Sequence, residues 1–248
     1  MTEKANADET VRFLCYEEFY GDIPEPRPAN RDVPKWFRET DNTFEDGKST
    51  VTQCRPFLDA MTLGWIIPLA DDIKVEAAEN GVTSFQWDFD IPLVHRQEEG
   101  VMGNISPYSD VSIFQWLSPW RIQVPENYSV LVTAPMNRNE PRFSVFSGVI
   151  DADQGFFNLN CPFIWEEIPY DGWVKKGTPI VQVIPFNRDG IVSDGEIRSM
   201  NAAEEKEAQK EDQQKIEQPS RYKNEKWVPK QGSRVIAQQL EDEDDRGE

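Results

Sequence analysis

The sequence has 248 residues, a net charge of −19, three cysteines and one histidine. A chain of this length buries roughly 70–75% of its unfolded surface, so it folds without disulfides. The widely separated Cys15, Cys54 and Cys161 suit a reducing cytoplasm and argue against a structural zinc site. The acidic charge opposes nucleic-acid binding, and no run approaches the roughly 18 apolar residues of a membrane helix, so we expect neither partner.

Composition divides the chain, beginning with residues 1–50, an N-terminal segment followed by a charged, proline-rich extension. We expect this extension to lie extended over the surface, with Trp36 and Phe37 as its anchors. Residues 51–190 are dense in Trp, Phe, Val and Ile and interrupted by Pro, Gly and Asn, which predicts an all-β sandwich or barrel without helices. The predicted strands of this core are Gly64–Pro68, Ile73–Ala77, Ser84–Phe89, Val111–Phe114, Trp120–Val124, Tyr128–Ala134, Val145–Ile150, Phe156–Asn160 and Ile180–Pro185.

The C-terminal part changes composition abruptly. Residues 197–218 are rich in Ala, Glu, Lys and Gln, and their propensity predicts a charged helix. Residues 219–248 join a basic and aromatic stretch, 221–230, to an acidic end that we expect to be disordered. The acidic neighbours of that stretch favour a partner-binding or self-docking segment over a nucleic-acid site.

Two motifs near the end of the core could carry chemistry. Gly-Val-Ile-Asp-Ala-Asp at 148–153 predicts a strand running into a tight turn, with Asp151 and Asp153 at its lip. Val-Lys-Lys-Gly-Thr at 174–178 is a turn signal before an apolar strand that only Gln182 interrupts. The two carboxylates could activate water or bind Mg²⁺, or they could form a solvated turn that accepts hydrogen bonds from backbone amides.

In this order and spacing, the two motifs resemble the core of the deoxyuridine triphosphatase family, over about residues 60–188. The resemblance implies a mainly β fold of the β-clip kind, a distorted barrel shared with dCTP deaminases. To this barrel the sequence adds the proline-rich N-terminal extension and a helical, partly disordered acidic tail. The resemblance also implies a water-polarising base at Asp151 and, because the family is typically trimeric, a trimer with sites shared between subunits.

Most other catalytic side chains of that family have no match here. Its Pro-Arg-Ser-Ser segment reads Pro-Met-Asn-Arg at 135–138, and its sugar-stacking tyrosine falls at Gln154 or Gly155. The opening aspartate falls on Ile66. The candidate site residues are a catalytic Asp151 and ligand-binding Asp153, Arg138, Asn137 and Gln182, with no metal ligand assigned.

A second resemblance is to uncharacterised proteins of tailed bacteriophages, including phages of marine cyanobacteria. It is carried by segments 54–61, 64–69, 134–137 and 177–186. It implies a viral origin, and therefore a location in the host cytoplasm or in the virion.

The retained core motifs and missing catalytic ones favour a non-catalytic phage protein without a cofactor. Such a protein would act through a protein partner, a nucleotide-like ligand or its own oligomer, for which a trimer is the first state to test. One alternative is a divergent pyrophosphohydrolase that uses Asp151 as base with Mg²⁺, and another is a decoration-type virion protein. Trp165 and Trp173 flank an acidic turn, and an exposed aromatic there would indicate a protein contact.

Overall fold

The structure is a computed structural model that describes residues 10–98, 100–101, 103, 111–218 and 220–244. Its strands are β1 (Arg12–Leu14), β2 (Arg27–Pro28), β3 (Trp65–Pro68), β4 (Ile73–Ala77), β5 (Thr83–Gln86), β6 (Val94–Arg96), β7 (Ile113–Gln123), β8 (Tyr128–Thr133), β9 (Phe143–Val145), β10 (Gly148–Ile150), β11 (Phe157–Trp165), β12 (Tyr170–Val174) and β13 (Pro179–Asn187). Its helices are α1 (Lys35–Arg38), α2 (Arg55–Thr62), α3 (Ala202–Glu217) and α4 (Gln231–Asp244). Short helical turns lie at Glu17–Phe19, Ala29–Asp32, Val51–Gln53, Arg188–Gly190 and Tyr222–Lys226.

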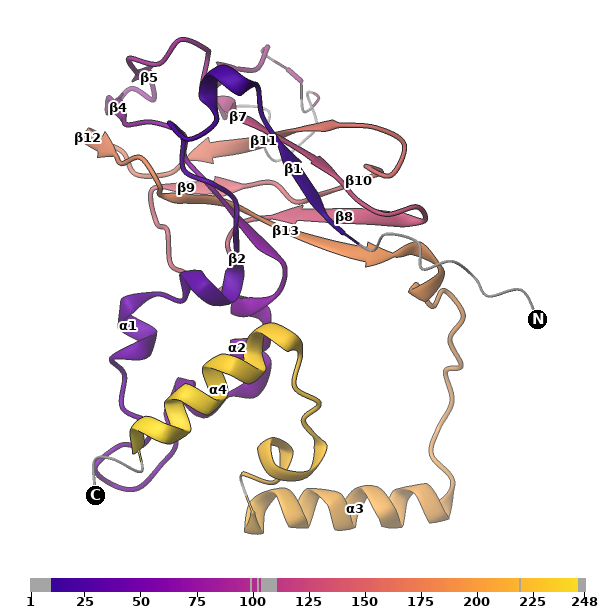
Figure 1. Cartoon of the computed structure of the whole chain (residues 1–248). Helices are drawn as coiled ribbons and strands as arrows, with labels where there is room; N and C mark the ends of the chain where they lie inside the picture. Colours follow the sequence, from indigo (N-terminus) through magenta and orange to yellow (C-terminus); the bar gives the residue numbers. More distant parts are fainter. Residues whose placement is uncertain (1–9, 99, 102, 104–110, 219, 245–248) are drawn as a thin grey trace.

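The strands form three antiparallel sheets (Figure 1). One has the order β1-β7-β11-β9, with β6 also paired to β7, and a second has the order β10-β8-β13-β3-β2. The third, β12-β4-β5, has three strands. The mainly β class predicted from the sequence is therefore confirmed.

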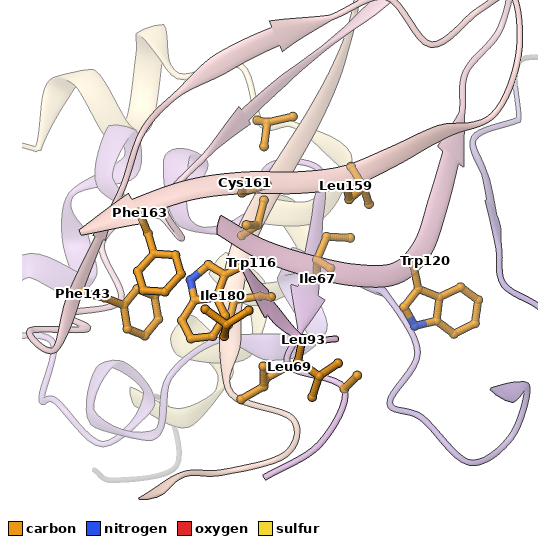
Figure 2. Packing of buried hydrophobic residues seen from close by; sticks show 14 of the residues in the cluster. Ile67, Leu69, Leu93, Trp116, Trp120, Phe143, Leu159, Cys161, Phe163 and Ile180 are labelled. Atoms are coloured by element: carbon orange, nitrogen blue, oxygen red, sulfur yellow. The ribbon is translucent and has the colours of Figure 1, made fainter. Parts of the chain in front are cut away.

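The main core fills the space between these sheets with apolar and aromatic side chains (Figure 2). At its centre, the rings of Trp116 on β7 and Phe163 on β11 stack with centroids 4.1 Å apart. Phe85 and Phe143 contact this pair edge-on. Trp165 extends the cluster, because it stacks on Phe143 and meets Phe85 edge-on. Alternation along each strand thus directs one set of side chains into a single aromatic core.

Strand β7 differs from the prediction, which placed two strands at Val111–Phe114 and Trp120–Val124. The chain is continuous through Pro119, because the register against β11 shifts between Asn158 and Asn160 at that point. A proline cannot donate to a ladder, but a β-bulge tolerates it. The proline therefore marks a bulge in one long strand.

The predicted strand Val145–Ile150 is divided in two. Its first part belongs to β9, which pairs with β11 in the first sheet. Its last three residues form β10, which pairs with β8 in the second sheet. The chain changes sheets at Phe146 and Ser147, and it thereby carries Asp151 to the edge of the second sheet.

A second, smaller core lies below the sheets and is built from helices. The buried residues are Val33, Phe37, Leu58, Met61, Ile236, Ala237 and Leu240. Phe37 anchors the N-terminal extension as predicted, whereas Trp36 is 42% exposed and contacts Phe37 and Phe57 edge-on. The expectation of no helix in 51–190 is wrong at α2, because this helix of eight residues is too short to show a periodic pattern.

The C-terminal part forms two helices with different surroundings. The predicted charged helix is α3, which begins at an Asn201–Glu204 capping box and buries no side chain. Figure 1 shows it standing apart from the sheets. Helix α4 packs beside α2 and reaches Asp244, so residues 240–244 are helical where we expected disorder, and 245–248 lie outside the described residues. Among the described residues, none of the helices has the length and apolar character needed to cross a membrane.

Candidate functional site

The five candidate residues lie in two groups, one at each end of strand β8. Gln182 on β13 is opposite Thr133, at one end of β8. Asp151 accepts a hydrogen bond at Oδ1 from the hydroxyl of Ser129, near the other end, at 2.6 Å. Ser129 and Thr133 are four positions apart along the strand, a distance of about 13 Å.

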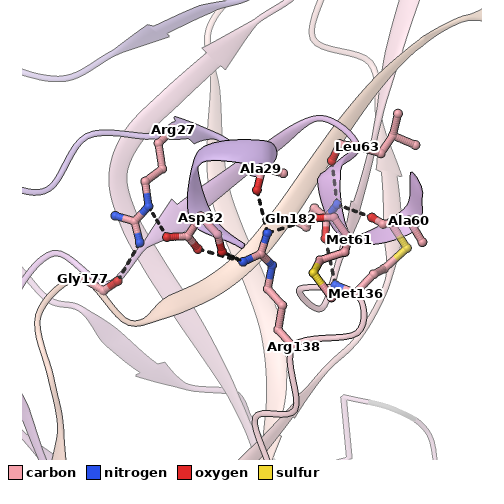
Figure 3. Close-up of polar contacts among 10 residues, drawn as sticks. All are labelled: Arg27, Ala29, Asp32, Ala60, Met61, Leu63, Met136, Arg138, Gly177 and Gln182. Atoms are coloured by element: carbon pink, nitrogen blue, oxygen red, sulfur yellow. Dashed lines mark hydrogen bonds and ion pairs between the residues drawn. The ribbon is translucent and has the colours of Figure 1, made fainter. Parts of the chain in front are cut away.

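The first group contains Gln182, which is completely buried (Figure 3). Its Oε1 accepts a hydrogen bond from the amide of Met136 at 2.8 Å. Its Nε2 donates to the carbonyl oxygens of Ala60 at 3.0 Å and Leu63 at 2.6 Å. This side chain joins strand β13 to the end of α2 and to the turn after β8.

Arg138 lies beside it, and its side chain is only 5% exposed. Its Nη1 donates to the backbone carbonyl and the carboxylate of Asp32, and its Nη2 donates to the carbonyls of Ala29 and Met61, both at 2.9 Å (Figure 3). Burial lowers the pKa of Arg138 to about 10, against the opposite effect of Asp32, so the guanidinium is charged at neutral pH. All four terminal N–H groups are used within the chain.

Asn137 occupies the turn between Gln182 and Arg138. Its φ of 59° is a left-handed conformation, which asparagine adopts more readily than most residues. Its Nδ2 donates to the carbonyl of Phe57 at 3.0 Å. Like its two neighbours, this side chain fastens the helical region to the sheets.

Asp32 and Arg27 complete this network, and neither was among the site residues predicted from the sequence. Arg27 Nε donates to Asp32 Oδ1 at 2.5 Å, while Arg27 Nη2 donates to the carbonyl of Gly177 at 3.3 Å. The carboxylate of Asp32 therefore lies between two guanidinium groups (Figure 3). No sequence signal reveals this arrangement, since Asp32 and Arg138 are separated by 106 positions.

The second group lies at the turn after β10. The side chain of Asp153 is only 4% exposed, and it accepts hydrogen bonds from Arg188 Nη2 and from the amide of Asn127, the latter at 3.1 Å. The Arg188 guanidinium lowers the pKa of Asp153 below its usual value of 3.8. Arg188 also donates from Nη1 to the carbonyl of Tyr128 at 2.7 Å. The Arg188 guanidinium therefore neutralises the charge of Asp153, and Asp153 Oδ2 accepts both hydrogen bonds.

Asp151 is the more available carboxylate of the pair. Its side chain is 72% exposed, and Oδ1 lies 3.7 Å from Arg188 Nη1. The strand and turn predicted at this position are present, because β10 ends at Ile150 and the carboxylate follows it. No sequence pattern pointed to Arg188, since only the β8–β13 register brings it here.

The single histidine of the sequence belongs to neither group. His95 is exposed on β6, on the edge of the first sheet. Across the described ranges, no group of three or more His, Cys, Asp or Glu side chains is arranged to hold a metal ion. Within one chain, Asp151 is therefore an exposed carboxylate beside a guanidinium, separated from Arg138 and Gln182.

Comparison with known proteins found similarity to solved structures alone. No protein-family model matches the sequence, and no curated protein matches it. Among solved structures, the dUTPase from phage phi11 of S. aureus, described with a structural Mg(II) ion, is 11% identical, with a TM-score of 0.35 over 77% of this chain and 97% of that chain.

Two structures of the dUTPase of Staphylococcus bacteriophage 80alpha are similar to the same extent. The complex with dUpNHpp is 11% identical, with a TM-score of 0.34 over 77% of this chain and 88% of that chain. A second variant is 11% identical, with a TM-score of 0.35 over 78% and 99%, and phage dUTPases are described there as controlling transfer of virulence genes by a G protein-like mechanism. At this identity and these TM-scores, none of their chemistry is transferred to this chain.

Proposed function

We propose that this chain is a non-catalytic, phage-encoded binding protein on the dUTPase-like scaffold that its core motifs predict. It acts through a protein partner, a nucleotide-like ligand or its own oligomer, in the host cytoplasm. The observation that supports this function is the use of Arg138: its four terminal N–H groups go to Asp32, Ala29 and Met61. A guanidinium committed in this way is not available to neutralise a triphosphate.

Exposed apolar residues between β13 and α3 support action by association. Ile191, Val192, Ile197 and Met200 are all more than half exposed, in a segment without regular secondary structure. Four exposed apolar side chains within one short segment favour a contact with another molecule. A trimer is the first assembly to test, as the family resemblance implies.

Incubation of the full chain with each deoxynucleoside triphosphate and Mg²⁺ tests the non-catalytic role. We expect pyrophosphate release equal to that of buffer for both the wild-type protein and Asp151→Asn. Release that Asp151→Asn abolishes would overturn the proposal. Light scattering at micromolar concentration tests assembly separately, since a mass of 28.6 kDa would identify a monomer.

The exposed carboxylate of Asp151 favours one alternative, a divergent Mg²⁺-dependent pyrophosphohydrolase that uses Asp151 as general base. A base must be open to the attacking water, and this side chain is 72% exposed. The same assay decides between the two functions. A third possible function is that of a decoration-type virion protein. Mass spectrometry of purified particles tests it, because a virion protein would be detected there and a nonstructural protein would be absent.

A further inference from the structure

The solvent-facing side of the β12-β4-β5 sheet carries an unusual set of side chains. The register places Trp173 of β12 opposite Lys74 of β4, and Lys74 opposite Gln86 of β5. Two positions along, Asp171 lies opposite Glu76. These side chains therefore share one face, because alternate residues of a strand point to the same side.

This face is hollowed into a pocket of about 490 Å³. Lys74 and Gln86 line it together with two indoles and four carboxylates. We call the latter six residues the acidic tryptophan face: Asp71, Asp72, Glu76, Trp87, Asp88 and Trp173. Trp173 is 50% exposed, although a large aromatic side chain in a strand is usually covered. The exposed aromatic expected beside the acidic turn is therefore Trp173, whereas Trp165 belongs to the core.

The carboxylates of this face outnumber the cations around it. Lys74 is paired with Asp171, and Lys175 Nζ is paired with Asp72 at 2.8 Å. Asp71, Glu76 and Asp88 make no ion pair with any residue that the structure describes. Three negative charges thus remain uncompensated around two indoles, which produces a local potential that attracts cations.

The chain itself already places one ammonium group in this environment. Lys175 Nζ lies 5.2 Å from the centroid of the Trp173 ring while it contacts Asp72. A cation over an indole face gains electrostatic attraction from the ring, and the neighbouring carboxylate adds to it. The rim of the pocket therefore already shows how an ammonium group binds between an indole and a carboxylate. The carboxylates of Asp71, Glu76 and Asp88 lie beside it without an ion pair to any described residue.

We propose that the acidic tryptophan face binds an extended basic segment of a partner protein, whose lysine or arginine side chains enter the pocket against Trp173 and Trp87. The inference rests on the proposed binding function and names the partner's chemistry. Charge complementarity selects this occupant, because the face repels phosphate-bearing ligands and the carboxylates pair with guanidinium or ammonium groups. The stems of those long side chains can cover the exposed indole while their heads reach Glu76 and Asp88.

Fluorescence anisotropy with the full chain tests the inference. The probe is a short labelled peptide that alternates glycine with lysine, and an analogue with glutamine for lysine reports uncharged binding. At about 0.15 M salt, where long-range attraction is screened, we expect saturable binding of the lysine peptide only. The double variant Glu76→Gln/Asp88→Asn should weaken it about tenfold, and Trp173→Ala by a similar factor, whereas Trp173→Phe should keep most of the affinity.

The matched control removes the same two charges elsewhere. Glu205→Gln/Glu207→Gln lies on α3, away from the face, and should change the affinity less than about twofold. Equal losses in both double variants, or no saturable binding, would overturn the inference. Binding of Mg²⁺ alone at a site that Glu76→Gln/Asp88→Asn removes would also overturn the inference, because the occupant would then be a metal. Dissociation of an oligomer of this chain by the same double variant would overturn it too, because the occupant would then be a second copy. Pyrophosphate release is measured independently, so failure of the proposed function and failure of this surface are distinguishable.

Discussion

Trp227 donates a hydrogen bond from its indole nitrogen to Asp59 Oδ2 at 3.0 Å, and this contact fixes the C-terminal segment to helix α2. Lys230 Nζ reaches the same oxygen at 2.8 Å, and the Arg55 guanidinium lies 5.0 Å from the Trp227 ring centroid. The basic and aromatic stretch therefore docks on its own chain. It brings α4 to the position where Ile236 and Leu240 complete the smaller core.

Replacing Asp59 should release this docking. We expect Asp59→Ala to lower the free energy of unfolding by about 2 kcal/mol, the scale of hydrogen bonds to a charged group, as measured by urea denaturation. Hydrogen exchange should rise mainly in α4. The control Asp212→Asn removes an exposed ion pair with Lys215 on α3. It should change the free energy of unfolding by less than about 0.5 kcal/mol. An equal loss in both variants would contradict the assigned role.

The same contact should depend on pH. Burial alone raises the pKa of Asp59, but hydrogen bonds from Lys230, Ser233 and Trp227 outweigh it, so the pKa lies below the usual 3.8. A depressed folded-state pKa stabilises the protein above the unfolded-state value and loses this effect as pH falls through the folded-state value. The stability difference between wild type and Asp59→Ala should be constant near pH 7 and shrink below about pH 4. A difference that grew in acid would have the wrong sign.

Gln182 should be needed for stability rather than for binding. Gln182→Leu removes the buried amide that bonds to the N–H of Met136 and to the carbonyls of Ala60 and Leu63. These three backbone groups would then lack a hydrogen-bond partner. Since a buried polar group without a partner costs about 1–3 kcal/mol, we expect a loss of about 3 kcal/mol or more in urea denaturation. Gln209→Leu on exposed α3 is the control and should change little. A wild-type stability for Gln182→Leu would show that its hydrogen bonds are dispensable.

The aromatic stack at the centre of the core should dominate thermal stability. Phe163→Ala removes the ring stacked on Trp116 and leaves a cavity, so a loss of about 3–5 kcal/mol is expected. Phe156→Ala removes a ring of the same size at a position 58% exposed, and its effect should stay below about 1 kcal/mol. Calorimetric melting of the two variants compares them directly. Similar melting temperatures would mean that the core relaxes around the missing ring.

The cysteines should differ in reactivity. Burial raises the pKa of Cys161 to about 12, whereas Cys54 is exposed just before α2. Because the thiolate is the reactive form, a disulfide reagent at neutral pH should label Cys54 rapidly and Cys161 only after denaturation. Mass mapping of the labelled peptides identifies the site, with Cys54→Ser as the control. Rapid labelling of Cys161 in the native protein would indicate local opening of β11.

Local sequence patterns predicted the strands well where one face is buried, as in Ile73–Ala77, whose observed bounds are the same. They failed where long-range pairing decides the structure. The bulge at Pro119 depends on β11, and the sheet change after Val145 depends on two partners distant in sequence. Helix α4 was missed because its few apolar residues gain their burial from α1 and α2, far earlier in the chain.

For Asp151 and Asp153, the sequence predicted the local backbone structure but not the surrounding residues. The motif located Asp151 and Asp153 at the end of a strand, as observed. It contained no information on Arg188, which is 35 positions from Asp153 and neutralises it. It also could not show that Arg138 turns inward to Asp32, since a guanidinium is equally compatible with a ligand and with buried carbonyl groups.

The long connection between β13 and α4 links the last helix only loosely to the sheets. Residues 191–201 are exposed and irregular, and α3 buries nothing, so the last helix is held by its own contacts and by the tether. The tether keeps the effective concentration of α4 beside α1 and α2 at about the millimolar range. A protease cut within 191–201 would leave the C-terminal piece bound as a separate peptide, and the stability of the smaller core would then depend on protein concentration.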